Sequence, residues 1–295
     1  MTTTAWVFPG QGSQKIGMQA DLENIPTAKA KLDRAEEILG WSILEVCKNE
    51  PEKLSRTLYT QPCLYAIASI LADLLFAAGQ NPQYVAGHSL GEYVALYAAG
   101  AYDFETGLQL VKRRGELMDA AEGGKMYALM GFDREQLQAK IDETADVVLA
   151  NDNSAAQVVI SGTPAAVDRV VAAVKSKRAI ELNVSGAFHS HLMKEASQKF
   201  NEILDKVTFN ESKIPVLANV EPTPTTHAGE LKARLQQQMT GSVRWREIMD
   251  AIAANEVEKI IEVGPSQVLT GLFKRAYSKI PRSNISSMAD IAAID

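Results

Sequence analysis

Hydrophobic and polar positions along this 295-residue chain predict strands and helices in alternation. The apolar run at 4–8 predicts a β-strand followed by the glycine loop 10–12, and 27–39 predicts a helix. The stretch at 64–78 is apolar almost all round and is closed by Gly79, so it predicts a helix buried inside the protein. Strands that alternate with helices are typical of an α/β fold with a largely parallel sheet.

A later segment has a different order of predicted elements, β-α-β-β-α-β, which is typical of a ferredoxin-like fold. These elements are predicted at 126–130, 134–143, 147–150, 157–161, 165–174 and 179–182. Glycines at 123–124 and at 186 flank the segment, as expected where a chain crosses between domains. We therefore predict a large α/β domain formed by 1–123 and 188–295, with an inserted ferredoxin-like subdomain at 124–187. Clefts between domains are common ligand sites.

Beyond the inserted subdomain the alternation of strands and helices resumes, and the chain is expected to return to the large domain. In this part we predict helices at 191–205, 230–239 and 245–255 and strands at 214–218 and 259–263. No internal repeat and no low-complexity tract is evident.

Residues 87–91 read Gly-His-Ser-Leu-Gly, a GxSxG pentapeptide between a predicted strand at 84–86 and a predicted helix at 92–99. Glycines on both sides of Ser89 permit a strained turn because they carry no Cβ, and this turn projects the serine hydroxyl from the end of a sheet. The strand, turn and helix together predict a nucleophile elbow. This context favours an acyl-transfer enzyme over a glycine-rich turn with an incidental serine.

The composition of the chain disfavours some classes of function but does not identify one. Hydrophobic residues make up 46% and charged residues 22%, as in soluble globular proteins. A formal charge of -6 disfavours nucleic-acid binding, which needs a basic surface. Neither a signal peptide nor a spanning apolar stretch is evident, so we expect a cytoplasmic protein without membrane contact. Cys47 and Cys63 have no CxxC spacing, so we expect buried free thiols.

A serine hydroxyl is a poor nucleophile at neutral pH and needs a base, usually histidine. His88 follows a strand directly before Ser89, so its side chain should point away and pack beneath the elbow. His227 follows a loop rich in Pro and Thr and is expected to be solvated. His189 lies where the chain re-enters the large domain and is the better base. His191 raises a metal site as an alternative, but no HExxH or cysteine-rich set accompanies it, so we predict no metal.

Two other parts of an acyl-transfer site can be sought in the sequence. A carboxylate that orients the histidine is not evident from spacing, and Glu262 and Asp103 are candidates that could equally be surface charges. An oxyanion hole needs backbone N–H donors, one of them from the residue after the nucleophile, here Leu90. Gln11 in the glycine loop could supply the second donor. The same loop lacks the GK[ST] ending of a phosphate loop, and a simple turn is the alternative.

Arg114 interrupts an otherwise apolar face of a helix predicted at 104–121. Gly107, Val111 and Met118 repeat on the same stripe of that helix. A guanidinium on such a face must find an anion, because an unpaired buried charge is strongly destabilising. The partner is either an internal Asp or Glu or a carboxylate of the substrate. The planar, bidentate fork of arginine suits a carboxylate in both cases.

These residues together resemble the malonyl-CoA:acyl carrier protein transacylases of fatty acid synthesis. The shared motifs run in order over nearly the whole chain: Val-Phe-Pro-Gly-Gln-Gly-Ser-Gln at 7–14, Thr-Gln-Pro at 60–62, Gly-His-Ser-Leu-Gly-Glu-Tyr at 87–93, Arg-Gly at 114–115, Ala-Phe-His at 187–189 and Glu-Val-Gly-Pro at 262–265. The resemblance implies a hydrolase-like α/β domain with a mostly parallel sheet and an inserted ferredoxin-like (βαββαβ) subdomain, which agrees with the pattern of predicted elements.

The resemblance also assigns roles to residues at the matching positions. It makes Ser89 the acylated nucleophile and His189 the general base and acid. The backbone amides of Gln11 and Leu90 become the oxyanion hole, and Arg114 becomes the clamp for the free malonyl carboxylate.

The remaining assignments concern the surroundings of the histidine and the acyl group. In this family a main-chain carbonyl orients the histidine, and the matching position is Gln238. Phe188 is similar to the Ala-Phe-His pattern of malonyl-selective domains, and its bulk would crowd an α-methyl group. Met118, on the stripe of Arg114, is expected to contact the substrate.

The implied activity is a ping-pong transfer of the malonyl group from malonyl-CoA to the phosphopantetheine thiol of acyl carrier protein, with no cofactor, by a monomer. The carrier is expected to be acidic, and the candidates for a basic face that receives it are Lys175, Lys177, Arg178, Lys274 and Arg275. Three alternatives remain open: an acyltransferase of polyketide synthesis, a GxSxG serine hydrolase, and a non-catalytic module that docks the carrier.

Overall fold

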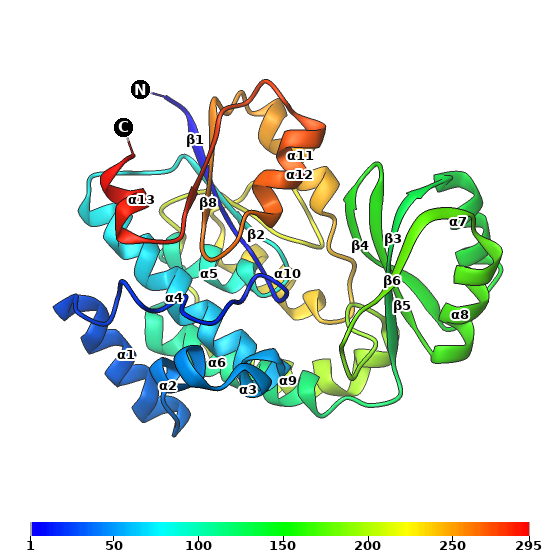
Figure 1. Ribbon diagram of the computed structural model, residues 1–295, viewed down its shortest axis with the longest axis horizontal. Helices are drawn as coiled ribbons and strands as arrows, with labels where there is room; N and C mark the ends of the chain where they lie inside the picture. Colours follow the sequence, from blue (N-terminus) through cyan, green and yellow to red (C-terminus); the bar gives the residue numbers. More distant parts are fainter. Residues whose placement is uncertain (1, 295) are drawn as a thin grey trace.

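A parallel five-stranded sheet forms the centre of the larger part of the molecule (Figure 1). The computed structural model describes residues 2–294, so Met1 and Asp295, the outermost residues of the predicted large domain, lie outside the described residues. The strand order is β7-β2-β1-β8-β9, and every neighbouring pair is parallel. The strands are β1 (Thr4–Phe8), β2 (Tyr84–Gly87), β7 (Val216–Leu217), β8 (Lys259–Val263) and β9 (Arg282–Ile285). The predicted mostly parallel α/β architecture is confirmed.

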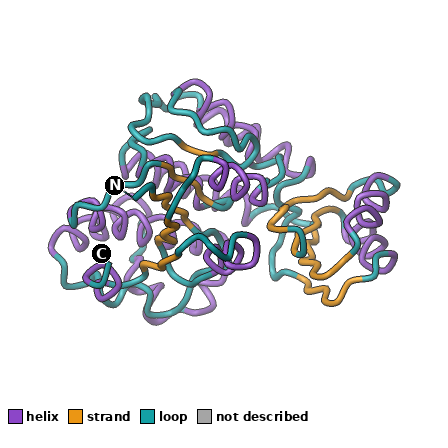
Figure 2. The backbone as a smooth tube through the Cα atoms, turned by 90° about the horizontal axis from the view of Figure 1, so that it is seen from above, coloured by secondary structure: helices purple, strands orange, loops and turns teal. Residues whose placement is uncertain are grey.

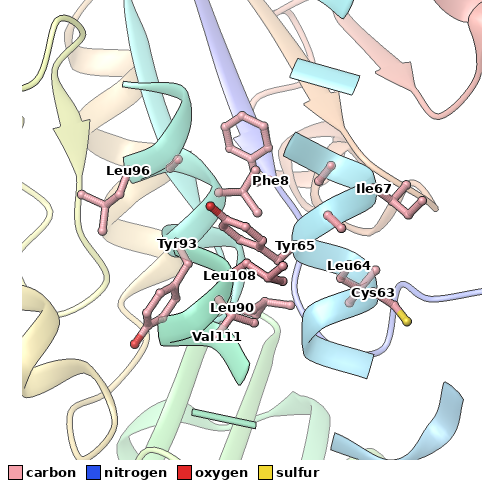
Figure 3. Packing of buried hydrophobic residues seen from close by; sticks show 14 of the residues in the cluster. Phe8, Cys63, Leu64, Tyr65, Ile67, Leu90, Tyr93, Leu96, Leu108 and Val111 are labelled. Atoms are coloured by element: carbon pink, nitrogen blue, oxygen red, sulfur yellow. The ribbon is translucent and has the colours of Figure 1, made fainter. Parts of the chain in front are cut away.

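Helices cover both faces of this sheet, as the alternation of side chains along β1 requires. Trp6 and Phe8 point to one face, where they join the larger hydrophobic core, and Ala5 and Val7 point to the other. Helices α1 (Pro26–Leu39), α4 (Thr57–Ala77), α5 (Gly91–Ala98), α6 (Phe104–Asp119) and α9 (Lys194–Leu204) contribute to the first core, and α11 (Trp245–Ala254) and α12 (Val268–Ala276) to the second. Figure 3 shows the first core, where side chains of α4, α5 and α6 meet Phe8.

Helix α4 corrects one prediction, because it begins at Thr57 rather than at 64. The polar sequence before Pro62, and the proline itself, are typical of a helix start, which misplaced the boundary. With 21 residues the helix is long and apolar enough to cross a membrane, but 78% of its most apolar window is buried inside the protein. It is therefore the central helix of the core.

A separate antiparallel sheet of four strands forms the smaller part of the molecule, with the order β4-β5-β3-β6. Its elements are β3 (Lys125–Phe132), α7 (Arg134–Asp142), β4 (Val147–Ser154), β5 (Gln157–Gly162), α8 (Pro164–Ala173) and β6 (Ser176–Glu181). This is the predicted ferredoxin-like βαββαβ arrangement. Both helices lie on the side of the sheet that faces away from the larger part (Figure 2). The subdomain limits 124–187 stay a prediction.

Strand β4 joins the small sheet to the larger part. The Asp152 N–H donates to the carbonyl of Val243 at 2.9 Å, and the Val243 N–H donates to the carbonyl of Ala150 at 2.8 Å. Arg246 of α11 adds an ion pair with the buried carboxylate of Asp152 at 3.1 Å. Strand β4, which runs four residues beyond its predicted end, is therefore fixed against α11 and the segment before it.

Several shorter elements complete the fold. The helix predicted at 191–205 is interrupted, because a 3₁₀ turn at His191–Met193 precedes α9. Helix α10 (Ala228–Gln238) follows the loop after β7. Helices α2 (Ile43–Asn49), α3 (Pro51–Ser55) and α13 (Met288–Ala292), together with α12 and β9, were not predicted. Most of them are too short for hydrophobic periodicity to be visible.

Candidate active site

A tight turn connects β2 to α5 at the carboxyl end of the central sheet. Ser89 at its tip has φ of 52°, in the left-handed region. The flanking glycines are required by space: a Cβ on Gly87 would lie 1.9 Å from the carbonyl carbon of Gly91, and a Cβ on Gly91 would lie 2.0 Å from the carbonyl oxygen of Phe8. The backbone is therefore packed as closely as a nucleophile elbow demands.

Asn219, which follows β7, holds this turn from the neighbouring strand. Its side-chain oxygen accepts the Ser89 N–H at 2.8 Å, and its side-chain nitrogen donates to the carbonyl of Gly87 at 2.6 Å. The residue is fully buried. These two bonds offset part of the cost of the strained serine backbone, which is of order 1–3 kcal/mol.

His189 lies opposite the serine. Its Nε2 is 2.8 Å from Ser89 Oγ, and its Nδ1 lies 3.0 Å from the carbonyl of Gln238 and 3.1 Å from that of Gly241. Carbonyls only accept, so Nδ1 carries the hydrogen and Nε2 accepts the serine proton. Burial and the nearby charge of Arg114 lower the pKa of His189 to about 3. The imidazole is therefore neutral at physiological pH and is in the form that a base needs.

Neither carboxylate considered as a partner of the histidine contacts it. Glu262 is buried, but it accepts hydrogen bonds from Leu269 and Thr270 at the start of α12. Asp103 accepts the Thr106 N–H and caps the start of α6. Both candidates for a triad acid were therefore wrong, because main-chain carbonyls take that place.

The other histidines lie away from the serine hydroxyl. His88 Nε2 is 2.7 Å from Asn153 Oδ1, and its ring packs against Trp245, as expected for a hydrogen-bonded histidine beside the elbow. His191 is exposed and pairs with Asp146. His227 is exposed near Glu211. Within residues 2–294, no group of three or more His, Cys, Asp or Glu side chains could hold a metal ion.

Arg114 projects from α6 and is completely buried beside the serine. Its Nη1 donates to Gln61 Oε1 at 2.8 Å, and its Nη2 donates to Ser89 Oγ at 3.0 Å and to Gln238 Oε1 at 3.1 Å. Its Nε has no hydrogen-bond partner among the described residues. No ion pair joins Arg114 to a carboxylate within residues 2–294, so the internal ion pair considered from the sequence is absent there. The guanidinium is therefore a buried cation with an open donor.

Two backbone amides, those of Gln11 and Leu90, are expected to face an oxyanion. They lie in the loops that follow two neighbouring strands. Phe8 of β1 pairs in register with Gly87 of β2, so the loops that carry Gln11 and Leu90 leave the same edge of the sheet. Neither the Gln11 nor the Leu90 N–H has a hydrogen-bond acceptor among residues 2–294. Both donors remain available for a ligand.

A cavity of about 230 Å³ lies over these groups, between the two sheets. Residues from both parts of the molecule line it, among them Gln11, Gln61, Ser89, Arg114, Met118, Asn151, Asn153, Phe188, His189 and Leu272. Phe188 and Met118 are both buried against it, and Met118 Sδ also accepts a hydrogen bond from Gln61 at 3.3 Å. Six of the eight predicted site residues thus line one cavity, and Leu90 and Gln238 do not line it.

Known proteins share this arrangement. Residues 5–293 match the family described as the acyl transferase domain. The chain belongs to this family. It is 55% identical to a malonyl CoA-acyl carrier protein transacylase of Synechocystis sp. over 291 residues, which cover 99% of each protein. The resemblance stated from the sequence motifs is confirmed.

Solved structures agree with the acyltransferase fold. The crystal structure of a malonyl-CoA:ACP transacylase of Synechocystis sp. has a TM-score of 0.97 at 54% identity and covers 99% of this chain and 100% of that chain. A malonyl transacylase in complex with a type II polyketide acyl-carrier protein has a TM-score of 0.93 at 36% identity, over 99% of this chain and 98% of that one. The two-part fold is therefore shared along the full length.

Sequence reasoning missed three side chains of the acyltransferase site, namely Gln61, Asn219 and Glu92. Gln61 lies in the Thr-Gln-Pro motif, so the motif was noticed but no role was given to it. Asn219 is separated from Ser89 by 130 residues and carries no local signal. Glu92 follows the GxSxG pentapeptide directly and is almost completely buried.

Proposed function

We propose that this acyltransferase moves the malonyl group from malonyl-CoA to the phosphopantetheine thiol of acyl carrier protein, through a malonyl ester on Ser89. The observation that carries the proposal is the meeting of three groups. Ser89 Oγ lies within hydrogen-bond distance of both His189 Nε2 and Arg114 Nη2. A nucleophile, its base and a buried cation thus lie together in one cavity, which suits an acyl group that ends in a carboxylate.

In the first half-reaction, Ser89 Oγ forms a bond to the thioester carbonyl carbon while its proton passes to His189 Nε2. The carbonyl oxygen becomes an oxyanion, which the free N–H groups of Gln11 and Leu90 stabilise. Collapse of this intermediate breaks the carbon–sulfur bond, and the sulfur of CoA takes the proton back from His189. The Nδ1–H bonds to the Gln238 and Gly241 carbonyls keep the correct ring nitrogen facing the serine.

In the second half-reaction, the pantetheine thiol of the carrier gives its proton to His189 and its sulfur attacks the seryl ester. The carbon–oxygen bond breaks, and Ser89 regains a proton from the imidazolium. A thioester is consumed and a thioester is formed, so the exchange is nearly balanced in energy. The proposed chemistry uses no metal and no redox cofactor.

The acyl group is selected by the walls of the cavity. Arg114 binds the free carboxylate of the malonyl group, because its guanidinium is buried with an unpartnered Nε. Phe188 and Met118 form apolar walls beside it, and the bulk of Phe188 leaves little room for an α-methyl group. A malonyl group therefore fits better than acetyl, which lacks the charge, or methylmalonyl, which is wider.

The decisive experiment is mass spectrometry after brief exposure to malonyl-CoA, followed by a chase with acyl carrier protein that bears phosphopantetheine. We expect a malonyl adduct on Ser89 that disappears as the carrier gains it. Free malonate without carrier would instead indicate a hydrolase, and no adduct would indicate a binding module.

A basic face beside the cavity is proposed to receive the acidic carrier. Arg275 of α12 approaches Gln157 Oε1 of the small sheet at 3.4 Å. Gln157 pairs with Met130, which pairs in turn with Arg178, so Arg178 lies two strands away, at about 10 Å. Lys175, Lys177 and Lys274 are also exposed at these two places. Cations from both parts of the molecule thus flank one edge of the small sheet.

We propose that the protein serves fatty acid synthesis. We also propose that it lies in the cytoplasm and is a monomer. Polyketide synthesis is the second candidate, because one similar structure holds a polyketide acyl-carrier protein. This protein can be expressed in a bacterium whose own malonyl transacylase is switched off. Restored growth would support the fatty acid pathway, and a failure to restore growth would favour polyketide synthesis. Light scattering of the purified protein tests the monomer.

A further inference from the structure

Glu92 is a buried carboxyl group that the proposed mechanism leaves unused. It lies in the first turn of α5, three residues after Ser89, and is 1% exposed. Its Oε2 accepts the backbone N–H of Asn219 at 2.9 Å and the side-chain Nε2 of Gln238 at 3.0 Å. No Lys, Arg or His among the described residues forms an ion pair with it. Buried carboxylates of this kind are rare unless a positive charge lies nearby.

Arg114 is connected to Glu92 through the side-chain amide of Gln238. On one side the amide nitrogen donates to Glu92, and on the other the amide oxygen accepts Nη2 of Arg114 at 3.1 Å. The orientation of the amide is fixed, because its NH₂ group must face the carboxylate and its oxygen must face the guanidinium. Gln238 also donates to the carbonyl of Ser89 at 2.9 Å. One glutamine therefore links the cation, the anion and the nucleophile.

Building on the proposed function, we infer that Glu92 is the indirect counter-ion of Arg114, and that it sets how strongly the cavity prefers an acyl group with a free carboxylate. A carboxylate placed directly on the guanidinium would occupy the donors that the malonyl group needs. A carboxylate one amide away balances the buried charge and leaves the Nε donor of Arg114 without a partner among the described residues. Glu92 is thus a residue that tunes specificity without touching the substrate.

The counter-ion role has a consequence that a structural role lacks. With a malonyl group bound, the malonyl carboxylate and Glu92 are two anions near the one cation of Arg114, so the charge of Glu92 weakens malonyl binding. An acetyl group carries no charge and is insensitive to it. Through roughly 8 Å of protein interior, removal of the Glu92 charge should raise the malonyl to acetyl preference by roughly tenfold. The ratio cancels effects on Ser89 and His189, because both acyl groups use them.

The pH dependence of the same ratio gives a second readout that needs no variant. Burial raises the pKa of Glu92 to about 7. The charged and titratable groups that face it are Arg114 of α6, Arg234 of α10, Tyr93 of α5 and Tyr102 after α5. Burial raises the pKa of both phenols, so they stay neutral, and an arginine side chain is not deprotonated in proteins. The pKa of His189 is about 3, so its imidazole does not titrate in the same range. The malonyl to acetyl ratio should fall as pH rises from about 6 to about 8.

The test compares kcat/KM for malonyl-CoA and acetyl-CoA, followed as ester formation on Ser89, in the unmodified enzyme, Glu92→Gln and Glu262→Gln. A glutamine oxygen still accepts both hydrogen bonds at position 92, so mainly the charge is lost. We expect a ratio roughly tenfold higher and independent of pH in Glu92→Gln. Glu262→Gln removes another buried carboxylate of the same sheet edge and should keep the pH-dependent ratio.

An unchanged or lower ratio in Glu92→Gln would overturn the inference. If that variant does not fold, the unmodified enzyme decides, since a ratio that is flat from about pH 6 to about pH 8 also overturns it. The proposed function fails separately, when the unmodified enzyme forms no malonyl ester on Ser89. If the ester forms but the malonyl to acetyl ratio does not depend on Glu92, only the counter-ion role is refuted.

Discussion

Two strand-to-helix turns at the same edge of the central sheet show how similar side chains acquire different tasks. The first turn leads from β2 to α5 and the second from β8 to α12. Each has a serine in the left-handed region, Ser89 with φ of 52° and Ser266 with φ of 76°. Each also has a buried glutamate, Glu92 and Glu262, whose pKa is raised by burial.

The partners of the two glutamates differ. Glu262 accepts the N–H groups of Leu269 at 3.1 Å and Thr270 at 2.7 Å, so its charge faces the start of α12 and anchors that helix. Glu92 accepts one backbone N–H, but its second donor is a side-chain amide that continues to Arg114. A carboxylate held by a helix terminus stabilises the fold, whereas one bonded to a side-chain amide that also contacts Arg114 can influence the charge of the site.

The largest expected effect concerns the two serines. Ser89→Ala should abolish the malonyl adduct and lower transfer by about 10³-fold or more, because no other group can replace the nucleophile. Ser266→Ala is the matched control, since the hydroxyl of Ser266 is buried and has no hydrogen-bond partner within residues 2–294. It should leave transfer within about twofold. A slow adduct on another residue in Ser89→Ala would contradict the proposed role.

Arg114→Ala should have the next largest effect, confined to acyl groups that carry a carboxylate. Loss of one partner from a desolvated charge pair commonly costs about 2 to 5 kcal/mol, so the malonyl preference over acetyl should disappear. The measurement is kcat/KM for malonyl-CoA and acetyl-CoA. Arg114→Lys keeps the charge but not the planar fork and should recover only part of the preference. Unchanged selectivity in Arg114→Ala would refute the clamp role.

The first turn could be predicted from sequence because its requirements are local. Glycines on both sides of Ser89, a strand before it and a helix after it are all visible within 84–99. The strand Thr4–Phe8 was predicted with correct limits for the same reason. The second turn was only partly recognised, because α12 was not predicted and Glu262 was taken for a possible partner of the histidine.

The contacts that complete the site could not be read from spacing, because they depend on how distant loops meet. Asn219 reaches Ser89, and the Gly241 carbonyl reaches His189, only when β7 and α10 have taken their places beside β2. The role of the Gln238 carbonyl came from the resemblance alone. Nothing in the sequence indicated that the Gln238 side chain would also connect Arg114 to Glu92.

Glu262→Ala should act on stability rather than on chemistry, with a smaller effect. It leaves the first N–H groups of α12 without an acceptor, and an unsatisfied buried group costs about 1 to 3 kcal/mol. Urea denaturation should show a lower free energy of unfolding. The activity per folded molecule, measured well below the unfolding transition, should stay within about twofold of the unmodified enzyme. A raised malonyl to acetyl ratio would place Glu262 in the same role as Glu92.

The smallest expected effect lies at the far end of α12, where the second turn contributes to the proposed carrier face. Lys274→Glu and Arg178→Glu each reverse one exposed charge, one on each side of the edge that receives the carrier. We expect transfer to the carrier to slow by a few-fold at low salt, because steering by surface charge is weak and long-ranged.

Two controls separate this effect from damage to the chemistry. Ester formation from malonyl-CoA should be unchanged in both variants, since neither residue lines the cavity. Lys29→Glu, on exposed helix α1 far from the small sheet (Figure 1), should change neither half-reaction. The difference between variants and unmodified enzyme should vanish at high salt, because exposed charges are screened within about 10 Å at 0.1 M ionic strength. Transfer rates without any salt dependence would remove the basic face from the proposal and leave α12 as a wall of the cavity only.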